Sequence, residues 1–218
     1  MHLIRALLFL TLLLFPLLGR VMDFSKEYLD KIASQYGEYA KRRLVSWEKL
    51  IAENKDKTEQ EKLAAVNLFF NLIPYQSDLT HWGKEDYWAT PLEMLVSGSG
   101  DCEDYSIAKY YTLVKLGVPD NKLMITYVKA LEANPQAHMV LTYYETPTSM
   151  PLVLDNLNGE ILPASERTDL KPVYSFNGIG LWSAKQQGLG KKLGQASDLK
   201  MWTDMETRMN NATISNFK

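Results

Sequence analysis

The sequence predicts an α+β fold, in which helices form the first part of the chain and an antiparallel sheet follows. Apolar residues recur at helical spacing as far as Gly117, and the pattern then changes to extended runs separated by turn residues. The chain has 218 residues, of which 46% are apolar, so it can bury one good core but not two large ones. We therefore expect residues 23–218 to form a single domain.

Residues 1–22 differ from the rest and are expected to form a signal peptide or signal anchor. Arg5 precedes an apolar run from Ala6 to Leu18, which is too short for a comfortable membrane span and suits a secretory signal. The alternative is a buried N-terminal helix, but a segment without a polar face would need burial on all sides. The residues before Arg20 form a poor cleavage pattern, so the exported protein is expected to be either soluble or tethered.

Two helices are predicted before the central part of the chain. The first spans about residues 23–54, where apolar and aromatic residues from Tyr28 to Ile51 recur at helical spacing. The second begins at Thr58, because Glu61 three residues later completes a capping box, and it continues towards Pro74. Both are most simply interpreted as core-forming helices.

A long irregular loop is predicted at residues 75–99, which are rich in Trp, Tyr, Pro and Gly and show no clear period. Helical spacing resumes after Gly100 and stops at Gly117, with Pro119 just beyond. This places Cys102 at or near the first turn of a helix.

The remainder of the chain is predicted to be mostly extended. An antiparallel meander is expected from three strands, at residues 122–131, 138–145 and 151–157. Further extended chain is expected at 173–182, followed by a short amphipathic helix at 198–209. The glycines between Gly188 and Gly194 lack the spacing of a phosphate-binding loop.

Composition excludes several classes of function. The formal net charge is -2 and the lysines are scattered, so the sequence predicts no basic surface that would bind nucleic acid. A single cysteine cannot form an internal disulfide, so the fold must depend on its core. One cysteine and three histidines, one of which lies in the signal segment, also exclude an ordinary Cys/His zinc site.

The stretch SGSGDCEDYSIAKYY, residues 97–111, places the cysteine where a helix N-terminus favours a thiolate. A nucleophilic thiolate also needs a base to take its proton and a third group to hold that base. His138 at the start of one predicted strand and Asp155 at the end of another are the plausible partners, whereas His81 lies in the loop. The alternatives are a buried structural cysteine, a structural histidine and an aspartate that only serves a turn.

The run DYWATPLEMLVSGSGDCEDYSIAKYYTLVKLGV, residues 86–118, with HMVL at His138 and LDN at Asp155, resembles the bacterial transglutaminase-like cysteine proteinases of the LapG type. The resemblance implies a papain-like or transglutaminase-like fold, with Cys102 as nucleophile, His138 as general base and then acid, and Asp155 orienting the imidazole. It also implies a calcium-dependent periplasmic endopeptidase that cleaves a large surface adhesin near its N-terminus, at a paired-alanine site, and so disperses biofilm. The partners it implies are that adhesin and an inner-membrane receptor that sequesters the protease when cyclic di-GMP is high.

Asp101, Glu103 and Asp104 surround the cysteine with negative charge, which opposes a thiolate. At about 6 Å and an effective dielectric of about 20, one carboxylate costs roughly 2.8 kcal/mol, more than the ~0.3–1 kcal/mol that a helix dipole supplies. A bound cation would cancel this field, and calcium suits a cluster of carboxylate oxygens. The resemblance implies the same ligands, Asp101 and Glu103 first and Asp104 next, and Asp86 in the preceding loop is a weaker candidate. The alternative is that acidic residues in a first helical turn point into solvent.

A tetrahedral intermediate needs hydrogen-bond donors aimed at its oxyanion. The backbone amide of Cys102 is one candidate, and Trp82 in the aromatic loop is the side chain we would test as the second, although Trp82 and Trp88 can equally be packing residues. Two other functions stay open. One is a protein-crosslinking acyltransferase, because an acyl-enzyme also supports transamidation. The other is a non-catalytic, calcium-responsive module that docks on a receptor.

Overall fold

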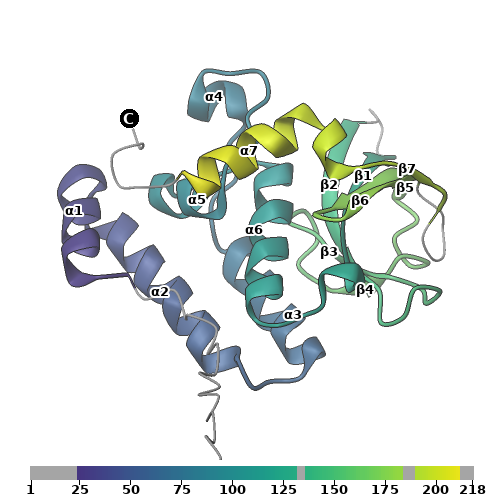
Figure 1. Cartoon of the computed structure of the whole chain (residues 1–218), viewed down its shortest axis with the longest axis horizontal. Coiled ribbons are helices and arrows are strands. Elements are labelled where there is room, and N and C mark those ends of the chain that lie inside the picture. Colours follow the sequence, from purple (N-terminus) through teal and green to yellow (C-terminus); the bar gives the residue numbers. More distant parts are fainter. Residues whose placement is uncertain (1–23, 132–135, 184–189, 212–218) are drawn as a thin grey trace, which may run out of the picture.

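The computed structural model describes residues 24–131, 136–183 and 190–211, and the expected signal segment at 1–22 lies outside them. These residues form a layer of helices against one face of a seven-stranded antiparallel sheet (Figure 1). The predicted α+β class is therefore confirmed. None of the helices in the described ranges is both long and apolar enough to cross a membrane.

The helices before the sheet follow the predicted pattern, with one break. They are α1 (Lys26–Tyr36), α2 (Glu38–Asn54), α3 (Glu59–Asn71), α4 (Asp78–Trp82), α5 (Pro91–Ser97) and α6 (Cys102–Lys115). The single helix predicted over 23–54 is divided at Gly37, whose φ of 87° lies outside helical geometry. The capping box predicted for α3 is present, because Thr58 and Glu61 each accept a hydrogen bond from the other's backbone amide.

The prediction of an irregular loop at residues 75–99 was wrong in part, because this segment contains α4 and α5. α5 begins with a second capping box, in which the Thr90 side chain and the Glu93 side chain exchange hydrogen bonds with each other's amides. Pro91 occupies the first helical position, where its missing N–H is harmless. The apolar face of α5 is buried, and this packing stabilises the helix. The segment is too short to show a clear helical period in the sequence.

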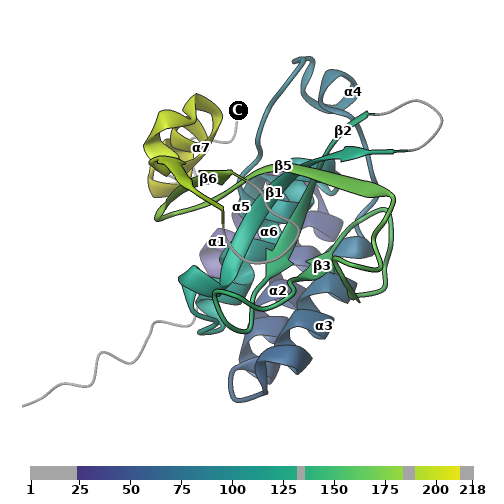
Figure 2. The same cartoon turned by 90° about the vertical axis from the view of Figure 1, so that its right-hand side faces the viewer.

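The strands are β1 (Leu123–Ala130), β2 (Gln136–Tyr143), β3 (Leu152–Leu154), β4 (Leu162–Pro163), β5 (Leu170–Asn177), β6 (Gly180–Ser183) and β7 (Lys192–Gly194). Their order in the sheet is β4-β3-β2-β1-β5-β6-β7, and all neighbours are antiparallel. The predicted meander corresponds to β1, β2 and β3, while β5 continues the sheet on the other side of β1 (Figure 2). The last helix, α7 (Lys200–Asn210), is held by Trp202, which is fully buried against Tyr111 and Phe176.

The helix that begins at Cys102 lies at the centre of the molecule. α6 packs on β1 and β2 with one side and on α3 and α5 with the other, and Ile107 and Leu113 are fully buried in the core that results (Figure 1). Burial of this helix on several sides fixes its direction, since every face has a neighbour. Its N-terminus therefore has a defined position relative to β2.

Candidate active site

The backbone around Cys102 is held by a capping box on one side and by a β-bridge on the other. Cys102 is the first residue of α6, and Asp101 and Asp104 form a capping box around it. Gly100 pairs with Tyr75 in a parallel bridge. A Cβ on Gly100 would approach the Asp104 carboxylate to 2.8 Å, so this position accepts only glycine without rearrangement. The nucleophile predicted from sequence is thus presented by a rigid turn.

The sulfur of Cys102 lies beside the part of β2 that does not pair with β3. β3 pairs with β2 only at residues 141–143, so the part of β2 that carries His138 and Met139 has no β3 neighbour. The Met139 amide donates to the Cys102 sulfur there, which favours the thiolate. Burial, followed by the charges of Glu103 and Asp101, outweighs this and raises the pKa of the thiol well above its ordinary value.

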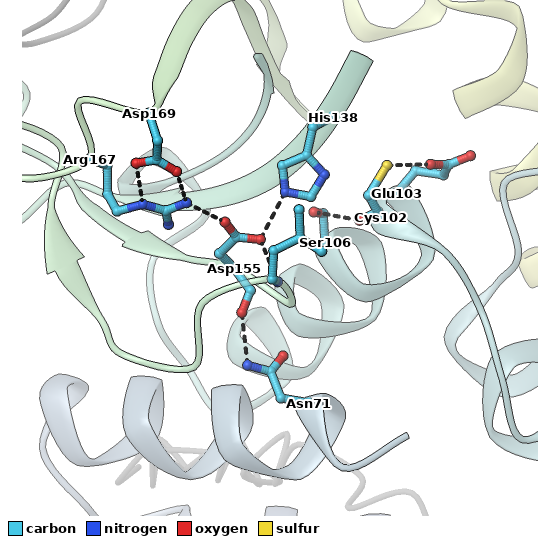
Figure 3. A network of polar contacts seen from close by, with 9 residues as sticks. Asn71, Cys102, Glu103, Ser106, His138, Asp155, Arg167 and Asp169 are labelled. Atoms are coloured by element: carbon cyan, nitrogen blue, oxygen red, sulfur yellow. Dashed lines mark hydrogen bonds and ion pairs between the residues drawn. The ribbon is translucent and has the colours of Figure 1, made fainter. Parts of the chain in front are cut away.

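The His138 ring connects the sulfur to a buried carboxylate. Its Nε2 lies 2.8 Å from Asp155 Oδ1, and both side chains are almost inaccessible. Figure 3 shows the ring between Asp155 and Cys102, with its second nitrogen turned towards the sulfur. The first turn of α6, β2 and the chain just after β3 therefore bring together the three residues that the sequence predicted as nucleophile, base and orienting group. Their catalytic roles stay a prediction.

Asp155 is fixed by several further contacts (Figure 3). The Leu157 amide donates to Oδ1 at 3.0 Å, Arg167 Nη2 donates to Oδ2 at 2.7 Å, and Asn71 Nδ2 donates to the Asp155 carbonyl at 2.8 Å. Burial alone would raise the pKa of Asp155, but hydrogen bonds and the charge of His138, with help from Arg167, lower it to about 2. Asp155 is therefore an anion throughout the pH range in which proteins are usually stable.

Arg167 was not predicted from the sequence. Its side chain is 4% exposed and reaches both the buried Asp155 and the half-exposed Asp169. No spacing rule connects it to the cysteine or the histidine, because it comes from the chain that follows β4. Only the tertiary fold places it behind the triad.

Replacement of Arg167 by methionine is expected to destabilise the protein by about 3–5 kcal/mol, because it leaves Asp155 as a buried and poorly compensated charge. Urea unfolding measures the change. Asp169→Asn is the matched control, since the Asp169 side chain is 50% exposed and its pair with Arg167 should contribute about 1 kcal/mol or less. Equal losses of stability from the two substitutions would contradict a special role for the buried Arg167–Asp155 pair.

The acidic residues predicted around Cys102 belong to a larger cluster. Asp78, Asp101 and Asp104 offer carboxylate oxygens within 4.8 Å of one another, as do Asp78, Asp86 and Glu103. Four of the five are buried, and Asp86 is exposed. Asp78 was missed by the sequence analysis, because the first residue of a five-residue helix carries no signal of its own. The structure therefore contradicts the alternative in which these acids simply point into solvent.

Burial and mutual repulsion hold protons on this cluster. Burial, and then the Asp101 charge, raises the pKa of Glu103 to about 9, and burial raises the pKa of Asp78 to about 6. The pKa of Asp101 is raised and that of Asp104 is raised strongly, burial being the largest cause for both. Glu103 also accepts a hydrogen bond from the Cys102 thiol at 3.0 Å. Without a cation, the cluster thus favours a neutral thiol.

The cluster fits a hard divalent cation. One oxygen of Asp78 and one of Asp101 are buried without any hydrogen-bond partner among the described residues. Buried carboxylate oxygens are normally hydrogen-bonded or bound to metal. The ligands on offer are all oxygens, which is the donor set that calcium prefers.

Metal-free protein is expected to lose stability as the pH rises from about 4 to about 9. The folded Glu103 keeps its proton up to about pH 9, whereas the unfolded chain releases it near its model value of 4.5, so the contribution is present at low pH and is lost as pH rises. Urea unfolding in chelator at pH 5 and pH 8 should differ by about 2–4 kcal/mol. In the isosteric Glu103→Gln variant, the stability at pH 5 and at pH 8 should be nearly the same. A wild-type protein that is more stable at pH 8 than at pH 5 would contradict the prediction.

Two other predicted residues lie in the α4 region. Trp82 packs against His81 and Tyr87, with ring centroids 4.4 and 4.8 Å apart, and its indole nitrogen is buried without a partner among the residues the structure describes. His81 is bonded to Gln76 and Ser99 rather than to the Asp155 network. The role of Trp82 at the oxyanion stays a prediction. Trp88, the other tryptophan named as a possible packing residue, is buried and stacked on Phe176.

Comparison with known proteins gives consistent results. Residues 36–174 match the family described as bacterial transglutaminase-like cysteine proteinases. Among solved structures, LapG of Legionella pneumophila is 46% identical, with a TM-score of 0.73 over 84% of this chain and 96% of that chain. Its EGTA-treated form gives the same values, and its calcium-bound form is 45% identical with a TM-score of 0.72, over 84% of this chain and 98% of that chain. A search of curated proteins found no match.

Proposed function

Because this chain belongs to the bacterial transglutaminase-like cysteine proteinases, we propose that it is a calcium-dependent endopeptidase with Cys102, His138 and Asp155 as its catalytic triad. One observation supports this most directly. The Cys102 sulfur accepts a hydrogen bond from the residue next to His138, and the His138 ring is bonded to a carboxylate that is buried and charged. The side chains proposed as nucleophile, base and orienting group thus lie close to one another, as such a triad requires.

In this mechanism His138 takes the thiol proton as the sulfur attacks the carbonyl carbon of the scissile peptide. The backbone amide of Cys102, at the start of α6, is the proposed donor to the oxyanion, with Trp82 as the proposed second donor. His138 then gives its proton to the leaving amine, which departs with the C-terminal fragment. Water attacks the thioester with His138 as base, and the acid product leaves as the thiol reforms.

Asp101 and Glu103 are the proposed principal calcium ligands, with Asp78, Asp104 and Asp86 completing the set. A bound divalent cation would neutralise the carboxylates that now hold the Cys102 thiol in its protonated form. The calcium-bound LapG of Legionella pneumophila supports this assignment by analogy. Glu103 would then no longer compete with His138 for the thiol proton.

The proposed substrate is the N-terminal region of a large surface adhesin, whose release promotes biofilm dispersal. The proposed location is the periplasm, and the proposed regulator is an inner-membrane receptor that sequesters the protease when cyclic di-GMP is high. The similarity to LapG and the export pattern of residues 1–22 support these proposals.

The test is incubation of the protein with the N-terminal segment of a large adhesin from the same genome, with calcium and with chelator. Mass spectrometry should find two fragments that together gain one water, and only in calcium. A fragment joined to an added amine label would instead indicate an acyltransferase. An uncut segment in calcium would overturn the proposed protease function.

A further inference from the structure

The first part of β2 has no neighbouring strand on one of its two sides. β3 pairs with β2 at residues 141–143 only and then ends, because the chain turns at Asp155. The Leu157 amide donates to Asp155 Oδ1 and Asn71 donates to the Asp155 carbonyl, and both bonds fix this turn. Residues 136–140 of β2 therefore have no strand beside them on the β3 side within the described part of the chain.

The direction of the backbone groups along β2 follows from one hydrogen bond. The Tyr144 amide, just after β2, donates to the Lys122 carbonyl at 2.8 Å, on the β1 side. Successive residues of an antiparallel strand direct their N–H and C=O groups to opposite sides, and the register between β1 and β2 has no shift. The odd-numbered residues of β2 therefore direct their amides away from β1. The contact from the Met139 amide to the Cys102 sulfur agrees with this assignment.

This open edge of β2 is partly used and partly free. At Met139 the Cys102 sulfur accepts the hydrogen bond that the carbonyl oxygen of a neighbouring strand would otherwise accept. At Ala137, two residues earlier, the outward N–H and C=O have no hydrogen-bond partner among the described residues, and the residue is exposed. An unpaired strand edge of this kind is a template on which another extended chain can add.

We propose that an extended stretch of the substrate adds to this edge as a further strand, with its backbone bonded to the N–H and C=O of Ala137, an arrangement that rests on the proposed protease function. Paired strands lie about 4.8 Å apart, and the sulfur is bonded to the same edge two residues further along. A peptide paired at Ala137 therefore continues directly to the nucleophile, beside the intervening His138.

This mode of binding defines the class of substrate. Strand addition uses backbone groups, which nearly every residue carries, so its affinity depends little on side chains. It requires a segment that is free to become extended and whose own backbone groups are not already paired. The open edge thus accepts a flexible or unfolded stretch of a protein and rejects the same sequence within a folded helix or sheet.

The first experiment measures binding of the N-terminal adhesin segment of the cleavage assay, in calcium, to Cys102→Ala protein that cannot cut it. Ala137→Pro, added to this protein, removes the outward N–H and keeps the hydrogen bonds between β1 and β2. It should raise the dissociation constant at least ~10-fold, because the proline ring also obstructs the incoming strand. Ala137→Val keeps the N–H and should raise the dissociation constant by at most about threefold. Thermal unfolding checks that each variant is folded.

Hydrogen exchange followed by NMR gives a second measurement, which needs no change at Ala137. When the segment binds to Cys102→Ala protein, exchange of the Ala137 amide should slow at least ~10-fold. The Leu193 amide on β7, at the opposite edge of the sheet, is the reference and should not change.

Two results would overturn the pairing and leave the protease function in place, provided that wild type cuts the segment. One is an Ala137 amide that stays unprotected when the segment is bound, and the other is an unchanged dissociation constant in folded Ala137→Pro protein. A segment that wild type does not cut in calcium would instead overturn the proposed function, and the pairing with it.

Discussion

Cys102→Ala is expected to lower the rate of substrate cleavage by at least ~10⁴-fold, because no other side chain can form the acyl-enzyme. The residual rate would come from binding and from the oxyanion donors alone. Cleavage of the adhesin segment in calcium, followed by mass spectrometry over hours, measures the change. Cys102 is only partly buried, so the loss of its sulfur should leave a small cavity and little loss of stability.

The control for Cys102→Ala is thermal unfolding with and without calcium. The variant should keep its calcium response, because the carboxylates of Asp101 and Glu103 remain in place. A structural cysteine predicts the reverse pattern, with a lower melting temperature and unchanged cleavage. That result would move the chain towards the class of binding modules.

Removal of calcium is expected to lower the melting temperature by about 5–10 °C and the cleavage rate by at least ~100-fold. At a hundredfold excess over its dissociation constant, a ligand contributes about 2.7 kcal/mol, and each kcal/mol shifts the melting temperature of a domain of this size by about 2–4 °C. The rate falls because the uncovered carboxylates of Glu103 and Asp101 raise the pKa of the Cys102 thiol again. Differential scanning calorimetry and the cleavage assay, both in EGTA with calcium added back, measure the two effects.

Asp101→Asn separates calcium binding from other causes of this loss. The variant should lose most of the calcium response, yet its metal-free form should be more stable than metal-free wild type, because a buried like charge has been removed. Asp86→Asn, at the exposed position, should weaken the response less. If chelator changed neither melting temperature nor rate in wild type, a calcium site in this cluster would be excluded.

Local rules predicted the elements that carry the site. The helical period identified α6, and the start of that period just after Gly100 placed Cys102 in its first turn. The break at Gly37 could not be seen in the same way, because apolar residues keep a helical spacing on both sides of it. α5 could have been found, since Thr90, Pro91 and Glu93 form a recognisable helix start.

Local sequence rules could not predict the residues that reach the site from distant parts of the chain. Asp78 and Arg167 reach the centre from a short helix and from a turn, and nothing in their neighbouring residues marks them out. Lys109 is fully buried although it lies on the side of α6 opposite Ile107, where the helical period predicts a polar residue. Elements pack on both sides of α6, and only the tertiary fold reveals this.

The two halves of the site come from separate parts of the chain. The thiol and its acids lie within residues 78–104, on helices and their connecting loop, whereas the imidazole, its carboxylate and Arg167 lie within 138–167, on the sheet and the loops between its strands. A chain that has assembled only its helices holds the thiol without the His138 imidazole, and a detached sheet holds the imidazole without the thiol. In the proposed mechanism, peptide cleavage therefore requires that β2 and the chain after β3 have docked on α6.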